Sequence, residues 1–128
     1  MSYLLSEQWV NTFQEYGSGL PTMDISISCQ YEISGAPQGK VRYFAIFKDG
    51  KIVKADLGKY DSPDCLVSTT QEEVNLILHR RSSVTGSFMK GNLKIEGEYE
   101  KYLFGMNKVR STKEWASMLL ALRGDLET

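Results

Sequence analysis

An unbroken alternation of apolar and polar residues over positions 23–33 constrains the fold of this 128-residue chain more than any other feature. Its apolar members occupy every second position: Ile25, Ile27, Cys29, Tyr31 and Ile33. Successive side chains of a strand point to opposite faces of a sheet, so the pattern predicts a long strand with one buried face. The rest of the chain must therefore supply the sheet and a layer that covers it.

Four further strands are predicted from local signals. Residues 41–47 are apolar on both faces, which favours a central position in the sheet. Asp49-Gly50 is a strong hairpin signal that leads into a strand over residues 51–57. After a crossover loop, short strands are expected at residues 65–69 and 92–98.

Helices are predicted where apolar residues recur at helical spacing behind a capping residue. Ser6 can cap a first helix over residues 7–16, and capping boxes begin at Thr70 and Ser111. Shorter helices are expected near residues 84–90 and 100–108, and Gly124 is expected to end the last helix. The fold class is therefore α+β. We expect a single domain over residues 1–128, with a five-stranded, mostly antiparallel sheet, the element order α-βββ-crossover-β-αα-β-αα, and helices mainly over one face.

Composition excludes several classes of function. The chain has 15 basic and 16 acidic residues, whereas a nucleic-acid binder normally shows a basic excess. Cys29 and Cys65 form no CxxC pair, and the single His79 cannot complete a zinc site with them, so we expect neither a metal nor a cofactor. GxSxG, Walker and HExxH motifs are absent, which argues against an enzyme. With no visible secretory signal and no long apolar window, a cytoplasmic location is expected.

Three passages resemble the sterol carrier protein type 2 domain, a lipid-binding α/β domain. They are the opening Ser6-Glu7-Gln8-Trp9, the passage Asp64-Cys65-Leu66-Val67-Ser68-Thr69 before Glu72-Glu73, and Phe88-Met89-Lys90-Gly91-Asn92-Leu93-Lys94-Ile95-Glu96-Gly97-Glu98. The resemblance covers nearly the whole chain. It implies a five-stranded sheet and an apolar tunnel between sheet and helices, which the C-terminal helix helps to close. The function it implies is non-enzymatic binding and carriage of acyl chains or other lipids.

The candidate cavity residues are apolar side chains on helices that the family uses to roof its tunnel. They are Phe88, Met89, Met106, Trp115, Met118, Leu119 and Leu122. Methionine suits an adaptable binding surface, and a ligand cavity would measure some hundreds of Å³. The same helical spacing is also typical of a plain core. A protein-interaction or dimerisation module with a filled core therefore stays open, as does, more weakly, a cavity enzyme of a small-molecule pathway.

Residues 80–110 carry seven basic and three acidic side chains. The basic members are Arg80, Arg81, Lys90, Lys94, Lys101, Lys108 and Arg110. Such a cluster suits a carboxylate, a phosphate head group or a transient contact with an anionic membrane surface. Solvated helix and strand faces explain the same charges, and the sequence leaves the oligomeric state open.

Overall fold

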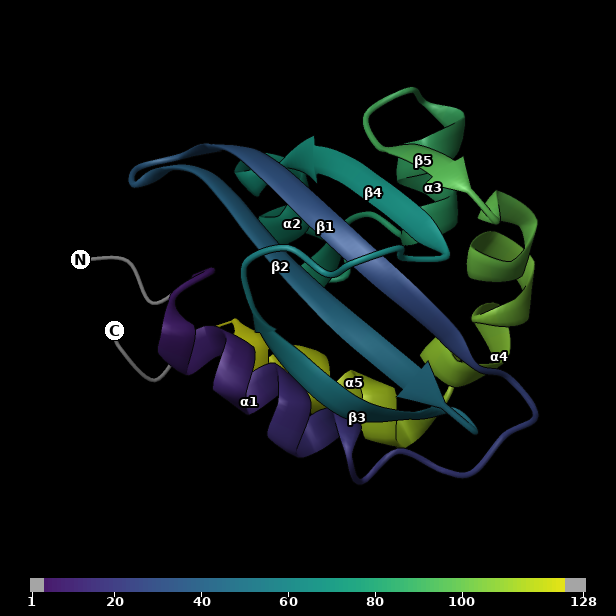
Figure 1. Cartoon of the computed structure of the whole chain (residues 1–128). Coiled ribbons are helices and arrows are strands. Elements are labelled where there is room, and N and C mark those ends of the chain that lie inside the picture. The colour runs from purple at the N-terminus through teal and green to yellow at the C-terminus, as the bar shows by residue number, and fades with distance from the viewer. Residues whose placement is uncertain (1–3, 124–128) are drawn as a thin grey trace.

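The alternating segment forms β1 (Ile27–Ala36), the middle strand of a five-stranded sheet with the order β3-β2-β1-β4-β5. The structure is a computed structural model that describes residues 4–123 (Figure 1). Ile27, Cys29 and Ile33 of β1 are buried, which confirms the predicted face. The strand begins later than the alternation suggests. The Ile25 N–H bonds locally to the Met23 carbonyl, so this donor does not join the sheet.

A hairpin adds β2 (Gly39–Lys48) and β3 (Lys51–Leu57) to one side of β1. Asp49 and Gly50 form its turn with φ values of 52° and 83°, the left-handed geometry of a type I′ turn. The predicted hairpin is thus confirmed, and β2 lies inside the sheet as its apolar faces indicate.

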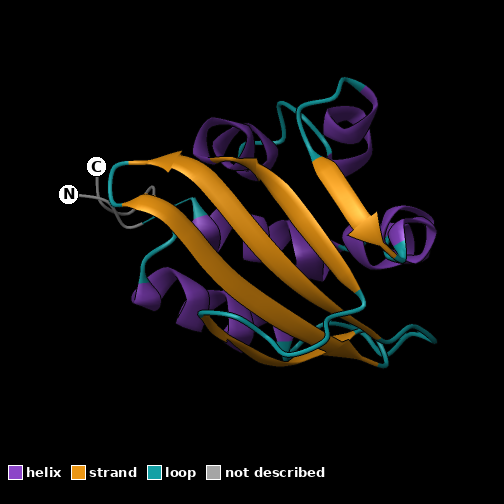
Figure 2. Ribbon diagram, turned by 45° about the horizontal axis from the view of Figure 1, so that its top comes forward, coloured by secondary structure: helices purple, strands orange, loops and turns teal. Residues whose placement is uncertain are grey.

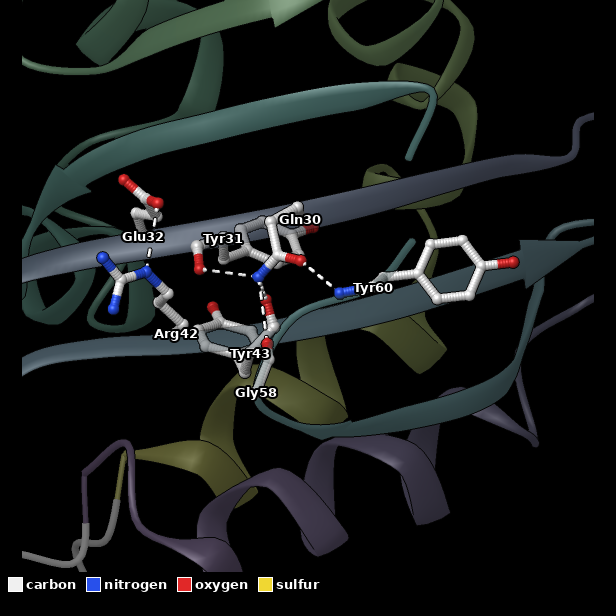
Figure 3. A network of polar contacts seen from close by, with 7 residues as sticks. All are labelled: Gln30, Tyr31, Glu32, Arg42, Tyr43, Gly58 and Tyr60. Atoms are coloured by element: carbon white, nitrogen blue, oxygen red, sulfur yellow. Dashed lines mark hydrogen bonds and ion pairs between the residues drawn. The ribbon is translucent and has the colours of Figure 1, made fainter. Parts of the chain in front are cut away.

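On the other side of β1, β4 (Cys65–Thr70) runs parallel to it, and β5 (Lys94–Gly97) runs antiparallel to β4. The loop from β3 to β4 crosses the face of the sheet that the helices leave open (Figures 1 and 2). Gln30 fastens this loop: its amide donates to the Gly58 carbonyl at 3.1 Å and accepts from the Tyr60 N–H at 2.6 Å (Figure 3). The crossover therefore covers a polar side chain of β1 and buries it.

Helices α1 (Glu7–Gly17), α2 (Gln71–Leu78) and α5 (Lys113–Leu122) cover the opposite face (Figure 2). Helix α3 (Val84–Met89), the π-helix η1 (Lys101–Gly105) and α4 (Asn107–Arg110) lie toward the β5 edge (Figure 1). The predicted helix over residues 100–108 is thus two short helices. Ser6 and Thr70 each accept a backbone N–H as predicted, which satisfies donors that helices leave open. The prediction of Ser111 as the last cap is wrong by one residue: Thr112 caps α5, because the Ser111 hydroxyl donates to the Asn107 carbonyl at the end of α4. Gly124 lies outside the described residues.

Candidate functional site

An apolar pocket of about 90 Å³ lies between the sheet and the helices. All three covering helices, α1, α2 and α5, contribute side chains to its wall, as do β1, β2 and β4. The lining residues are Trp9, Phe13, Tyr31, Ile33, Tyr43, Val67, Thr69, Val74, Ile77, Leu78, Val84, Leu93, Tyr102, Arg110, Trp115, Met118, Leu119 and Leu122. The pocket is therefore part of the main core, at the place where the sheet and the helical layer meet.

Four of the seven predicted cavity residues line this pocket, all of them on α5: Trp115, Met118, Leu119 and Leu122. They follow one helical stripe, and the Thr112 cap fixes the start of their helix. The carbonyl of Leu122 accepts a hydrogen bond from the Trp9 indole at 2.8 Å, which ties the end of α5 to α1.

The other three predicted residues do not line the pocket. Met89 ends α3 with 79% of its surface exposed, and Phe88 stacks on Tyr99 with ring centroids 6.5 Å apart. Met106 is buried, but it lies in the core outside the pocket wall. The prediction placed these residues on helices that the family uses to roof its tunnel, whereas α3 flanks the β5 edge of the sheet (Figure 1).

Aromatic residues that the sequence analysis did not select form much of the wall. Tyr43 is their centre: it stacks on Tyr31 at 4.6 Å and meets the edges of Trp9 at 5.5 Å and Phe13 at 6.1 Å. Tyr31 and Tyr43 are register partners on β1 and β2. The sequence does mark these residues as buried: Tyr31 belongs to the alternating apolar positions, and Trp9 and Phe13 belong to the apolar stripe of the first helix. That their side chains meet in one pocket depends on the strand register, which these patterns do not contain.

The pocket has a polar end. The hydroxyl groups of Tyr31 and Tyr102 lie 3.4 Å apart, and the Arg110 guanidinium carbon lies 4.6 Å from the centroid of the Tyr102 ring. Burial raises the pKa of Tyr31, Tyr43 and Tyr102. These hydroxyls therefore stay protonated at neutral pH and act as hydrogen-bonding groups.

Cys29 and Cys65 face each other as register partners of the parallel strands β1 and β4, and both are free thiols. Hydrogen bonding to Cys65 and burial raise the pKa of Cys29, so its thiol stays protonated at neutral pH. Within residues 4–123, no three His, Cys, Asp or Glu side chains are grouped as metal ligands. In the same part of the chain, no helix has the length and apolar character needed to span a membrane.

The volume of the pocket differs from the predicted one. We expected some hundreds of Å³, as ligand pockets for small molecules usually have, whereas this pocket measures about 90 Å³. The aromatic side chains of Trp9, Phe13, Tyr31 and Tyr43 occupy much of the space between the layers. A long chain could enter only if part of the wall moved.

Comparison with known proteins identifies relatives of this architecture. The sequence pattern of the SCP-2 sterol transfer family matches residues 24–103. None of the curated protein sequences matches the chain.

Solved structures share the fold at low identity. A conserved hypothetical protein of Thermus thermophilus, described as possibly a sterol carrier protein, has a TM-score of 0.74 at 12% identity, with 93% of this chain and 89% of that chain covered. Palmitated SCP2L2 of Aedes aegypti has a TM-score of 0.66 at 17% identity, with 85% and 95% covered. A crystal structure of sterol carrier protein 2 has a TM-score of 0.67 at 11% identity, with 94% and 97% covered.

Proposed function

The chain belongs to the SCP-2 sterol transfer family, and on this basis we propose that it binds and carries hydrophobic small molecules, acyl chains or other lipids. The observation that carries the proposal is the apolar pocket that lies between the sheet and α1, α2 and α5. Palmitated SCP2L2 of Aedes aegypti, which has the same fold, supports an acyl chain as the ligand. Transfer of such a chain from water would supply about 25 cal/mol for each Å² of apolar surface that is buried.

Binding requires that α5 moves outward, because the pocket of about 90 Å³ is too small for a long acyl chain. Two hydrogen bonds hold the end of this helix: Trp9 Nε1 to the Leu122 carbonyl at 2.8 Å, and Arg123 Nε to the Leu78 carbonyl at 2.9 Å. Such a local opening costs less free energy than global unfolding. We therefore assign α5 the role of the mobile wall.

A second candidate follows from the same small volume. A well-filled core without a ligand is what a protein-interaction or dimerisation module of this fold would have. In that case, palmitate would not bind to the pocket at all. Binding experiments therefore separate the two candidates.

The surface supports a transient contact with an anionic membrane as part of the proposal. Phe104 is 66% exposed, and the basic side chains of Lys101 and Lys108 are exposed near it in the sequence. Basic side chains near an apolar anchor favour anionic lipid surfaces. The two free thiols, Cys29 and Cys65, suit a reducing compartment such as the cytoplasm.

Two neighbouring residues of α5 provide the test. Leu119 lines the pocket, whereas the adjacent Leu120 does not line it and is exposed. We expect Leu119→Trp to fill the pocket and weaken palmitate binding about ten-fold or more, which corresponds to about 1.4 kcal/mol. Leu120→Trp should change the affinity less than two-fold. The measurement is displacement of a fluorescent acyl probe by palmitate.

Native mass spectrometry of the freshly purified protein, which would detect a co-purified lipid, accompanies this titration. Urea unfolding identifies any variant that does not fold, and Ile77→Phe on the α2 side of the pocket is the substitute for Leu119→Trp in that case. If palmitate displaces no probe from the wild-type protein, the interaction module is the better reading.

A further inference from the structure

Arg110 lies between the inner pocket and an outer groove. The groove measures about 450 Å³ and is bordered by α3, η1 and α4, with Ser83, Phe104, Asn107 and Ser111 among its lining residues. Val84 and Arg110 belong to the lining of both the pocket and the groove. These two residues therefore mark the place where the inner pocket adjoins a surface hollow.

The charge of Arg110 is partly buried, and it has no acidic partner among the residues that the structure describes. It is the only half-buried residue among the seven basic side chains of residues 80–110, since the others are exposed. Across residues 4–123, the ion pairs comprise only Arg42–Glu32, so no carboxylate of this part of the chain lies within 4.0 Å of Arg110. A partly desolvated charge without a counter-charge is unfavourable.

The guanidinium is held in place by neutral groups. It donates to the Tyr102 carbonyl at 2.8 Å and to the Leu103 carbonyl at 3.4 Å, and it lies over the Tyr102 ring. An arginine side chain has five N–H donors, so donors remain for a ligand. Its charge also acts inside the pocket: burial raises the pKa of Tyr102, and the positive charge of Arg110 opposes that rise.

We propose that Arg110 is the head-group site of this carrier and selects amphiphiles with a carboxylate over neutral ones. The carboxylate would bind to the guanidinium at the groove, and the chain would extend past Val84 into the apolar pocket. A planar guanidinium matches a carboxylate with two parallel hydrogen bonds, and a single positive charge matches a single negative one. A neutral alcohol would leave the charge of Arg110 unpaired. The inference rests on the proposed lipid binding, and it adds the chemistry and the location of the head group.

The test compares two ligands with the same chain, palmitate and hexadecanol, on three proteins. We expect the wild-type protein to bind palmitate about ten-fold or more tightly than hexadecanol. Arg110→Met should remove this preference by weakening palmitate alone. Lys54→Met is the control, because Lys54 is an exposed basic residue of β3 that lines neither hollow. This control should retain the wild-type preference.

The outcomes separate this inference from the proposed function. Equal affinity of the wild-type protein for both ligands, or equal weakening of both by Arg110→Met, would overturn the head-group site and leave lipid binding intact. Failure of both ligands to bind the wild-type protein would overturn both proposals. If Arg110→Met does not fold, the salt dependence of the wild-type protein decides: palmitate affinity should fall with rising salt and hexadecanol affinity should not. Salt independence of palmitate binding would overturn the site.

Discussion

At the residue scale, Gly17 shows how a missing side chain determines packing. It is the last residue of α1 and is buried. A Cβ atom at this position would lie 2.6 Å from Ile52 Cβ and closer still to Ile52 Cδ1, nearer than carbon atoms approach without a bond. The absence of a side chain therefore lets α1 lie directly on β3. In the sequence, the same glycine indicates only the end of a helix.

We predict that Gly17→Ala destabilises the protein by about 1–3 kcal/mol, because the added methyl group forces Ile52 or α1 to shift. This change in the free energy of unfolding is opposite in sign to the intrinsic helix preference, which favours alanine over glycine by about 1 kcal/mol. Gly19→Ala is the control, because a Cβ atom added at Gly19 would lie 3.6 Å from the Tyr16 carbonyl oxygen, an ordinary van der Waals distance. Urea unfolding should show a change within about 0.5 kcal/mol for the control. Equal effects of the two substitutions would contradict the close-approach argument.

Single residues were predicted well where the signal is local. The caps Ser6 and Thr70 depend on side chains that bond to the backbone three positions later, so the sequence contains all of the interaction. The last cap was predicted at Ser111, one residue before Thr112, because Ser111 and Thr112 are both capping residues and only the end of α4 decides between them. The exposure of Met89 depends on the direction of the six-residue helix α3, and tertiary packing sets that direction. Periodicity places an apolar side chain on a face of its helix, but it does not say what that face meets.

At the element scale, the strands and the long helices were predicted, whereas the break within residues 100–108 was not. The Met106 N–H bonds to the Lys101 carbonyl, five residues back, so the helix widens into a π-turn before α4 begins. The Arg110 guanidinium binds carbonyls of this turn. The parallel pairing of β1 and β4 is also absent from local patterns, because it depends on the crossover and on Gln30, which holds it.

We predict that the protein loses stability at high pH, because three tyrosines are buried between the sheet and the helices. Burial raises the pKa of Tyr31, Tyr43 and Tyr102 in the folded state, while each titrates near about 10 in the unfolded chain. Above that pH the unfolded state releases protons first, so the free energy of unfolding is fully retained below about pH 10 and falls as the pH rises further. Each tyrosine contributes a slope of about 1.4 kcal/mol per pH unit.

Urea unfolding between pH 8 and pH 11.5, an interval of roughly one to two units on each side of the tyrosine titration, measures this slope. Tyr31→Phe should make the slope shallower by about 1.4 kcal/mol per pH unit. Phe13→Leu, which removes no ionisable group from the same aromatic cluster, should leave the slope unchanged. A free energy of unfolding that stays constant across this interval would show that these hydroxyls ionise as easily in the folded state as in the unfolded one.

At the scale of the whole molecule, the sequence predicts the layers and the family but not the free space between the layers. The arrangement follows from patterns along the chain, and the match of residues 24–103 confirms the family resemblance. Free volume is the small difference between the space that the layers enclose and the side chains that fill it. Four large aromatic residues, Trp9, Phe13, Tyr31 and Tyr43, reduce it to about 90 Å³. Helical spacing alone could identify the α5 wall but not the free volume that the side chains leave.

The last prediction concerns the free volume of the pocket. Met118 is 0% exposed and lines the pocket, so Met118→Ala enlarges the pocket and should destabilise the free protein by about 2–5 kcal/mol. Met106→Ala is the matched control, because Met106 is 1% exposed but lies outside the pocket. Urea unfolding of both variants and of the wild-type protein, with and without saturating palmitate, gives the stabilisation by ligand in each case.

A ligand chain that enters the pocket fills the space left by Met118, so palmitate should stabilise Met118→Ala more than it stabilises the wild-type protein. It should stabilise Met106→Ala no more than the wild-type protein, since the space left by Met106 is closed to the ligand. The same extra stabilisation in both variants would mean that palmitate fills voids without preference. No extra stabilisation of Met118→Ala would place the ligand elsewhere. The pocket beneath α5 binds the ligand only if palmitate stabilises the Met118 variant more than the Met106 variant, since the two methionines are equally buried.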